Sequence, residues 1–240
     1  MTDVTMNENE QKIPDANIRP SHTPENTRRA AQSKSEPYGM STVTITPGTP
    51  DFNRFLTARN RAVIRGFDDV SIAISSLFRT VSAVRHPELV QAIQDWFNEL
   101  HDENDAMKTN LELHIGTIHV DENDPFFLST EFTPFRFESV QLNFNNQNTM
   151  RFYRHIFEMN NLLTQMYKYN SLGQLPVSDY NVMAHNIIRS LNMYIERVKK
   201  TLNVSRRVKG TYSPDEFIEK VKLYKSVQAY IAAELSGKRR

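Results

Sequence analysis

Residues 136–202 contain a short alternating segment followed by two long amphipathic segments, and this order constrains the fold more than any other feature of the chain. Polar and apolar residues alternate over 136–145, which is the period of a strand with one buried face. Over 149–169 and 179–202, apolar residues recur every three or four positions, which is the period of an amphipathic helix. A break containing Gly and Pro separates the two helical segments. The sequence therefore predicts a strand–helix–helix core.

The polar side of this predicted strand is a row of amide and hydroxyl side chains. Amides are uncommon on a strand face that meets only water, but they make good contacts with base edges. We therefore predict that this row contacts DNA bases in the major groove. Its members are Ser139, Gln141, Asn143 and Asn145.

A second strand–helix–turn–helix pattern lies earlier in the chain and provides an alternative ribbon. Residues 41–46 alternate, and Pro47-Gly48 stops them before a predicted helix over 51–65. Gly66 is predicted to end that helix before another helix over 70–84. The outward row would be Thr42, Thr44 and Thr46. We favour the later strand, because amides discriminate base edges better than hydroxyls do.

The flanking segments differ from the central one in composition. Residues 1–40 are rich in polar residues and proline and have almost no periodic apolar positions, which predicts a disordered arm. Residues 41–202 are predicted to form one helical domain. Residues 203–240 are predicted to be a basic linker followed by a C-terminal helix over 214–235.

Two further elements are predicted inside the helical domain. A helix begins at Pro87, a residue suited to a first helical turn, and runs to about Lys108. Residues 111–120 alternate with a change of parity at Gly116, which predicts a strand with a β-bulge. We expect this strand to pair with residues 136–144.

Charge is distributed unevenly along the chain, although the net charge is only +1. Residues 181–240 carry 13 Lys and Arg against 5 Asp and Glu, whereas residues 86–138 carry 2 against 12. The basic block suits DNA phosphates, and we predict phosphate contacts from Arg206, Arg207 and Lys209. The acidic segment 86–124 suits a protein partner. Alternatively, the two blocks face each other within the fold or across a dimer.

Composition also argues against several functions. The absence of Cys excludes disulfides, thiolate nucleophiles and Cys-based zinc sites. The sequence has only seven Gly and no Gly-rich phosphate-binding loop. No spacing of Ser, His and Asp identifies a nucleophile, and no ligand template identifies a metal site. We therefore expect neither an enzyme nor a cofactor. The sequence has no long apolar run, so we expect no membrane association and a cytoplasmic location.

The row Gln141-Leu-Asn143-Phe-Asn145 resembles the ribbon of ribbon-helix-helix repressors. This resemblance implies that two chains pair their strands into a ribbon that enters the major groove, while their helices interlock as a symmetric dimer. It also implies a phosphate contact at Ser178, where the second helix begins. Position 145 departs from the family, which carries Arg there. The predicted DNA contacts are completed by Arg136 and Arg151.

A broader resemblance covers residues 41 to about 235 and concerns regulators encoded by conjugative plasmids, including IncC-type plasmids, and by integrative conjugative elements. The resemblance implies a mainly α (α+β) fold, in which additional helices and short strands elaborate a ribbon-helix-helix core. It also implies a bacterial, cytoplasmic homodimer that binds double-stranded DNA and regulates conjugative-transfer genes. The alternative is a helical accessory protein of a mobile element that does not bind DNA. The landmarks are Val43–Thr46, Ile64–Phe67, Asp95–Phe97 and Gln141–Phe144.

Overall fold

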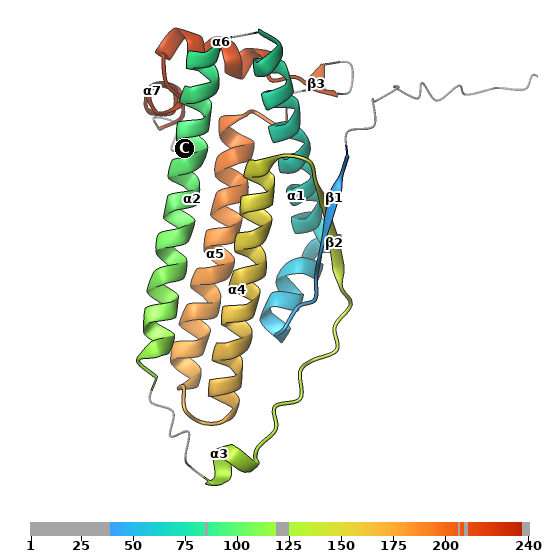
Figure 1. Ribbon diagram of the computed structural model, residues 1–240, viewed down its shortest axis with the longest axis vertical. Helices are drawn as coiled ribbons and strands as arrows, with labels where there is room; N and C mark the ends of the chain where they lie inside the picture. The colour runs from blue at the N-terminus through green and yellow to red at the C-terminus, as the bar shows by residue number, and fades with distance from the viewer. Residues whose placement is uncertain (1–38, 85, 119–124, 206, 209–210, 237–240) are drawn as a thin grey trace, which may run out of the picture. The chain divides into compact units, whose positions relative to one another are not determined.

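Four long helices pack side by side in the computed structural model (Figure 1), which describes residues 39–84, 86–118, 125–205, 207–208 and 211–236. Helix α1 contacts α4 and α5, and helix α2 contacts the same two helices. The expectation of a mainly α fold is therefore confirmed. The four helices are α1 (Pro50–Val84), α2 (Pro87–Gly116), α4 (Gln147–Ser171) and α5 (Val177–Thr201).

Shorter elements surround this bundle. Strand β1 pairs antiparallel with β2, and β3 pairs antiparallel with β4. Residues 1–38 of the predicted N-terminal arm lie outside the described residues. The shorter elements are β1 (Ser41–Ile45), α3 (Pro125–Ser129), β2 (Val140–Phe144), β3 (Arg207–Val208), β4 (Thr211–Tyr212), α6 (Asp215–Tyr224), α7 (Val227–Tyr230) and the π-helix η1 (Ile231–Leu235).

The predicted strand over residues 111–120 is wrong in its described part, because α2 continues through Gly116, and residues 119–120 lie outside the described residues. Leu111 and Ile115, four positions apart, are both buried, whereas Leu113 between them is 65% exposed. This is the pattern of one helix face, and the alternation of apolar residues that suggested a strand is incidental. The predicted pairing of this segment with residues 136–144 is wrong for the same reason.

Helix α1 does not end at Gly66 as predicted but runs on to Val84. Its regular geometry is interrupted earlier, at Arg61, which has a φ of 62°. A left-handed residue cannot continue a right-handed helix without a local break. Gly66 is buried, and a Cβ there would lie 3.4 Å from Cγ2 of Ile195. This is an ordinary van der Waals distance, so the packing of α1 on α5 leaves room for a Cβ at this position.

The predicted C-terminal helix over 214–235 is divided into two. Lys225 adopts a left-handed conformation with a φ of 63° and ends α6. The Ser226 side chain then caps the next helix by accepting a hydrogen bond from Ala229 N at 3.0 Å. The preceding segment, predicted as a linker, contains the short hairpin formed by β3 and β4.

Aromatic side chains join three of the four long helices in the core. The rings of Phe152 and Tyr194 stack with centroids 3.9 Å apart, linking α4 to α5. Phe67 of α1 packs edge-on against Phe152 at 5.8 Å, and its carbonyl accepts a hydrogen bond from the Tyr153 hydroxyl at 3.3 Å. This cluster packs α4 against α1 and α5, and β2 immediately precedes α4 in the chain.

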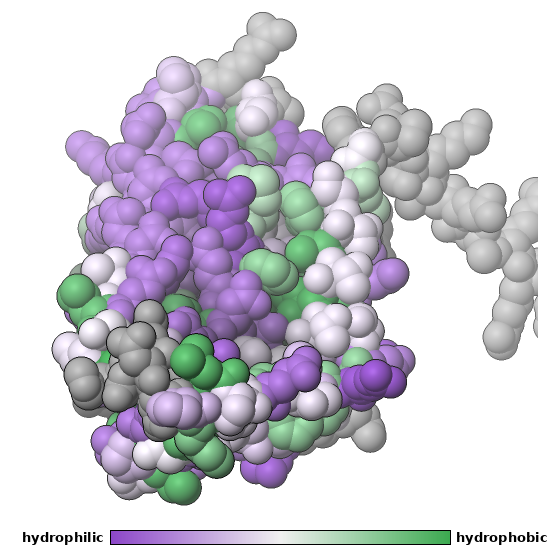
Figure 2. Space-filling view, turned by 60° about the horizontal axis from the view of Figure 1, so that its bottom comes forward, coloured by the Kyte–Doolittle hydropathy of each residue, from purple (hydrophilic) through white to green (hydrophobic). Residues whose placement is uncertain are grey.

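Figure 2 brings the lower end of Figure 1 forward. Hydrophilic side chains cover much of this face, and hydrophobic ones form smaller patches among them. Phe126 and Leu128 of α3 are among the exposed apolar side chains, at 69% and 71%.

Candidate nucleic-acid interface

Strands β1 and β2 form a two-stranded antiparallel ribbon along one side of the bundle (Figure 1). In its register, Thr42 lies opposite Asn143 and Thr44 lies opposite Gln141. The partner strand of β2 thus comes from the same chain. The expectation that a second copy must supply that strand is wrong, and the two predicted ribbons are the two halves of one.

The ribbon has one buried and one exposed face. Ile45, Val140 and Leu142 are buried, and β2 contacts both α1 and α4. Thr42, Thr44, Gln141 and Asn143 are all exposed. Since side chains alternate along each strand, the register places these four polar residues on the same outer face.

Hydrogen bonds between the strands orient part of this outer face. The Thr42 hydroxyl donates to Oδ1 of Asn143 at 2.7 Å. Beyond the other end of the paired strands, the hydroxyl oxygens of Thr46 and Ser139 are 2.7 Å apart and hydrogen-bonded. Gln141 has no side-chain hydrogen bond to another described residue. The face therefore combines fixed side chains at both ends with a free amide between them.

The helices hold the ribbon through buried polar groups. The Asn160 side chain of α4 donates to Thr46 O at 3.0 Å and accepts from Gly48 N at 2.9 Å. In α1, the Ser71 hydroxyl donates to Asn143 O at 3.2 Å. Asn160 is only 4% exposed. These contacts fix both strands relative to the bundle.

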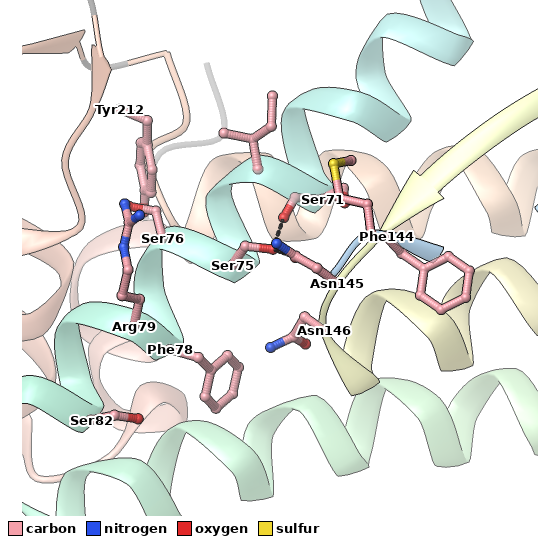
Figure 3. Close-up of a pocket in the computed structure, with 12 residues that line it drawn as sticks. Ser71, Ser75, Ser76, Phe78, Arg79, Ser82, Phe144, Asn145, Asn146 and Tyr212 are labelled. Carbon is pink, nitrogen blue, oxygen red and sulfur yellow. Dashed lines mark hydrogen bonds between the residues drawn. The ribbon is translucent and has the colours of Figure 1, made fainter. Parts of the chain in front are cut away.

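Asn145 lies beyond the end of β2 and turns toward α1, where the Ser75 hydroxyl donates to its Oδ1 (Figure 3). It lines a hollow of about 830 Å³ together with Ser76 and Arg79 of α1. Asn146 lines the same hollow and caps α4 by accepting a hydrogen bond from Asn148 N at 2.8 Å. Asn145 therefore belongs to the margin of the ribbon and not to its outer row.

The other predicted DNA contacts are dispersed. Arg136 is exposed in the segment that precedes β2. Arg151 points to α2, where it donates to Asn98 at 3.1 Å and pairs with Asp105 at 3.7 Å. Ser178 lies in the first turn of α5, and the 25 residues of α4, about 37 Å of helix, separate it from β2. The structure therefore does not bring Arg151 or Ser178 to the ribbon. Of the predicted phosphate contacts, Arg206 and Lys209 lie outside the described residues, and only the backbone of Arg207 is described, in β3.

Charged groups border the ribbon without entering its outer row. Arg61 donates to Oε2 of Glu138 at 3.0 Å, just before β2 begins. Both side chains are exposed, at 56% and 78%, so the ion pair is screened and can exchange partners. Arg61 is thus a charged side chain of α1 that lies beside the start of β2.

Part of the acidic segment is used inside the bundle. Glu103 of α2 pairs with Arg197 of α5, and Asp105 of α2 pairs with Arg151 of α4. Arg197 belongs to the basic block of the sequence. The pair between Glu103 and Arg197 supports the alternative in which the acidic and basic blocks face each other within the fold.

The described residues contain neither a cluster of metal ligands nor a membrane-spanning helix. Within this part of the chain, no group of three or more His, Cys, Asp and Glu side chains is arranged to hold a metal ion. Likewise, none of the helices described there is long and apolar enough to cross a membrane.

Comparison with known proteins gives one informative result. No family model matches the sequence, and no curated protein matches it. Among solved structures, the fold is similar to the crystal structure of AcaB from uropathogenic E. coli, with a TM-score of 0.57 and 8% identity, over 81% of this chain and 89% of that one. The likeness to AcaB that we expect from the sequence landmarks is thus supported at the level of the fold and no finer.

Proposed function

We propose that the protein is a sequence-specific DNA-binding regulator of conjugative-transfer genes that places its β1–β2 ribbon in the major groove. One observation carries the proposal: Thr42, Thr44, Gln141 and Asn143 form a single exposed face on a two-stranded ribbon whose other face packs on helices. A ribbon of this kind fits the major groove, where each base pair presents a distinct pattern of donors and acceptors. The shared fold with AcaB and the sequence resemblance to plasmid-encoded regulators supply the biological setting.

The side chains of this face have different contacts available. Gln141 has both its amide donor and its amide acceptor free among the described residues, which suits a bidentate contact with adenine. Asn143 already accepts from Thr42 at Oδ1, so the Nδ2 hydrogens are the part of its amide that remains wholly free. These hydrogens suit an acceptor such as guanine N7 or O6.

Phosphate attraction has to come from outside the ribbon, because its outer row carries no formal charge. Arg61 and Arg65 of α1 and Arg79 beside the hollow are exposed. Contacts from Arg206, Arg207 and Lys209 remain a prediction from the sequence. Binding that depends on such arginines weakens with added salt, with a slope that reports the number of phosphates contacted.

We also propose that two copies bind together. A five-residue strand is about 17 Å long, so one ribbon reaches only a few base pairs. Symmetric dimers commonly read two half-sites one helical turn apart and thereby increase specificity. Light scattering on the free protein and on its DNA complex distinguishes one copy from two.

The experiment that tests the function begins with selection of duplexes from a random library by the wild-type protein. The selected duplex is then titrated against the Gln141→Ala/Asn143→Ala variant in a gel shift with a random competitor. We expect wild type to prefer the selected duplex and the variant to lose that preference, because each bidentate contact contributes about 1–3 kcal/mol of discrimination. Asn181→Ala/Asn186→Ala, which removes two exposed amides from α5, is the matched control.

Two outcomes would contradict the proposal in different ways. Unchanged selectivity in the ribbon variant would mean that other residues read the bases. No binding of any duplex at low salt would favour the alternative of a helical accessory protein that acts through protein partners.

A further inference from the structure

A polar cavity of about 350 Å³ lies between α2 and α4, away from the ribbon. Its walls are one face of each helix, with residues at spacings of three and four along both. Most of the other buried side chains of these two helices are apolar, such as Phe97 and Ile156. The volume is near the lower end of the range for small-molecule sites, which occur between the helices of bundles.

The floor of the cavity consists of buried polar side chains, each with at least one atom that has no hydrogen-bond partner. His101, Asn104 and His155 are 2%, 7% and 3% exposed. No hydrogen bond to a described residue is made by Nε2 of His101, by Nδ2 of Asn104 or by either ring nitrogen of His155. Buried polar atoms are rarely left unpaired, since each unmade hydrogen bond costs about 1–3 kcal/mol. Water or a ligand therefore has to satisfy these four atoms.

The two imidazoles are uncharged at neutral pH. Burial lowers the pKa of His101 and of His155 to about 4. A neutral imidazole offers one donor and one acceptor, and Asn104 adds a donor. The floor is consequently suited to a hydrogen-bonding group and does not demand a charged one.

The rim of the cavity carries charges of both signs. Lys108 pairs with Glu158 at 3.1 Å, and Arg151 pairs with Asp105 at 3.7 Å, so two ion pairs bridge α2 and α4. Arg154, also on the rim, is exposed and has no ion pair with another described residue. In these pairs the carboxylates keep lone pairs and Arg151 keeps N–H groups that a ligand can use. A zwitterion can therefore bind groups of both signs on this rim, whereas a ligand carrying a single charge can bind only one.

We propose that this cavity binds a small zwitterion of the α-amino acid class. The carboxylate meets Arg154 and Arg151, the ammonium group meets Glu158 and Asp105, and a polar side chain reaches the unpartnered atoms of His155 and Asn104. The inference does not depend on DNA binding, because the ribbon contributes no residue to the cavity.

The test uses the full chain without DNA. Thermal unfolding is followed with each of the twenty common amino acids at 10 mM, and any that raises the Tm is titrated by calorimetry. We expect at least one polar amino acid to bind saturably, and Arg154→Ala to weaken its binding about tenfold or more, since a charge-assisted hydrogen bond is lost. Arg189→Ala, which removes an exposed arginine from α5, should leave affinity unchanged.

Further probes test whether binding requires both charges of the ligand and the polar floor of the cavity. Acetate alone and methylamine alone should bind much more weakly than the amino acid that contains both charges. His155→Phe fills the floor with an apolar ring and should abolish binding while the protein remains folded by circular dichroism. The proposal is overturned if no amino acid raises the Tm, if Arg154→Ala and His155→Phe bind as wild type does, or if Zn²⁺ binds in place of amino acids.

Discussion

The Thr42 hydroxyl donates to Oδ1 of Asn143 across the β1–β2 ribbon, over 2.7 Å. The hydrogen bond joins two side chains of the outer face that are 101 positions apart in sequence. The contact fixes the Asn143 amide with its oxygen toward Thr42 and its Nδ2 hydrogens available to a partner. Under the proposed function, the base group that this position contacts therefore depends on a threonine as well as on the asparagine.

Substituting Thr42→Val should change base preference more than stability. Losing an exposed hydrogen bond costs about 0.5–1.5 kcal/mol, and valine suits a strand well. The freed Asn143 can then use both amide groups on adenine, so selection from a random duplex library should yield adenine at that position in place of guanine. Thr44→Val, opposite Gln141, is the control. An identical selected motif for Thr42→Val and wild type would show that Asn143 is not oriented in this way when bound.

Asn160 should be among the residues on which the ribbon depends most. Asn160→Ala leaves Thr46 O and Gly48 N without their partner, and both groups lie close to the bundle. Because a buried unpaired group costs about 1–3 kcal/mol, we expect a loss of about 3 kcal/mol in the free energy of unfolding. Urea unfolding measures this loss. Asn161→Ala, at the adjacent exposed position, should change stability by less than about 0.5 kcal/mol.

The ribbon shows how much of the site the sequence contains. Both polar rows are visible in the sequence, because a period of two assigns faces without knowledge of the partner strand. Their pairing is not visible, since Thr44 and Gln141 are 97 positions apart and periodicity carries no information on which strands meet. The ribbon-helix-helix resemblance implied that β2 pairs with a strand of a second chain, whereas in the structure it pairs with β1 of the same chain.

The helices show a similar limit. Long amphipathic stripes predict α4 and α5 well, because many residues share one period. Around Gly116 the same reasoning fails, since a few alternating apolar residues fit both a strand and one side of a helix. The polar cavity between α2 and α4 could not be predicted at all. His101 and His155 look ordinary in the sequence, and only burial between two helices leaves their nitrogens without partners.

Gly48 should tolerate no side chain. A Cβ at this position would lie 1.8 Å from Oγ1 of Thr164, far inside van der Waals contact. We expect Gly48→Ala to lower the free energy of unfolding by about 1–3 kcal/mol, as overpacking usually does. Thr164→Ala in the same chain should restore part of this loss. Gly116→Ala, where a Cβ would meet nothing within 4 Å, is the control and should change stability by less than about 1 kcal/mol.

Stability should fall as the pH falls from 6.5 toward 4. Burial lowers the folded-state pKa of His101 and His155 to about 4, whereas the unfolded chain titrates near 6.5. Over this interval the unfolded state binds protons that the folded state does not. At pH 4, each histidine therefore lowers the free energy of unfolding by on the order of 3 kcal/mol. Urea unfolding at pH 7.5 and 4.5 should show a smaller loss for His155→Gln than for wild type. His185→Gln, at an exposed position, should lose as much as wild type, and equal losses in all three proteins would mean that His155 is protonated when folded.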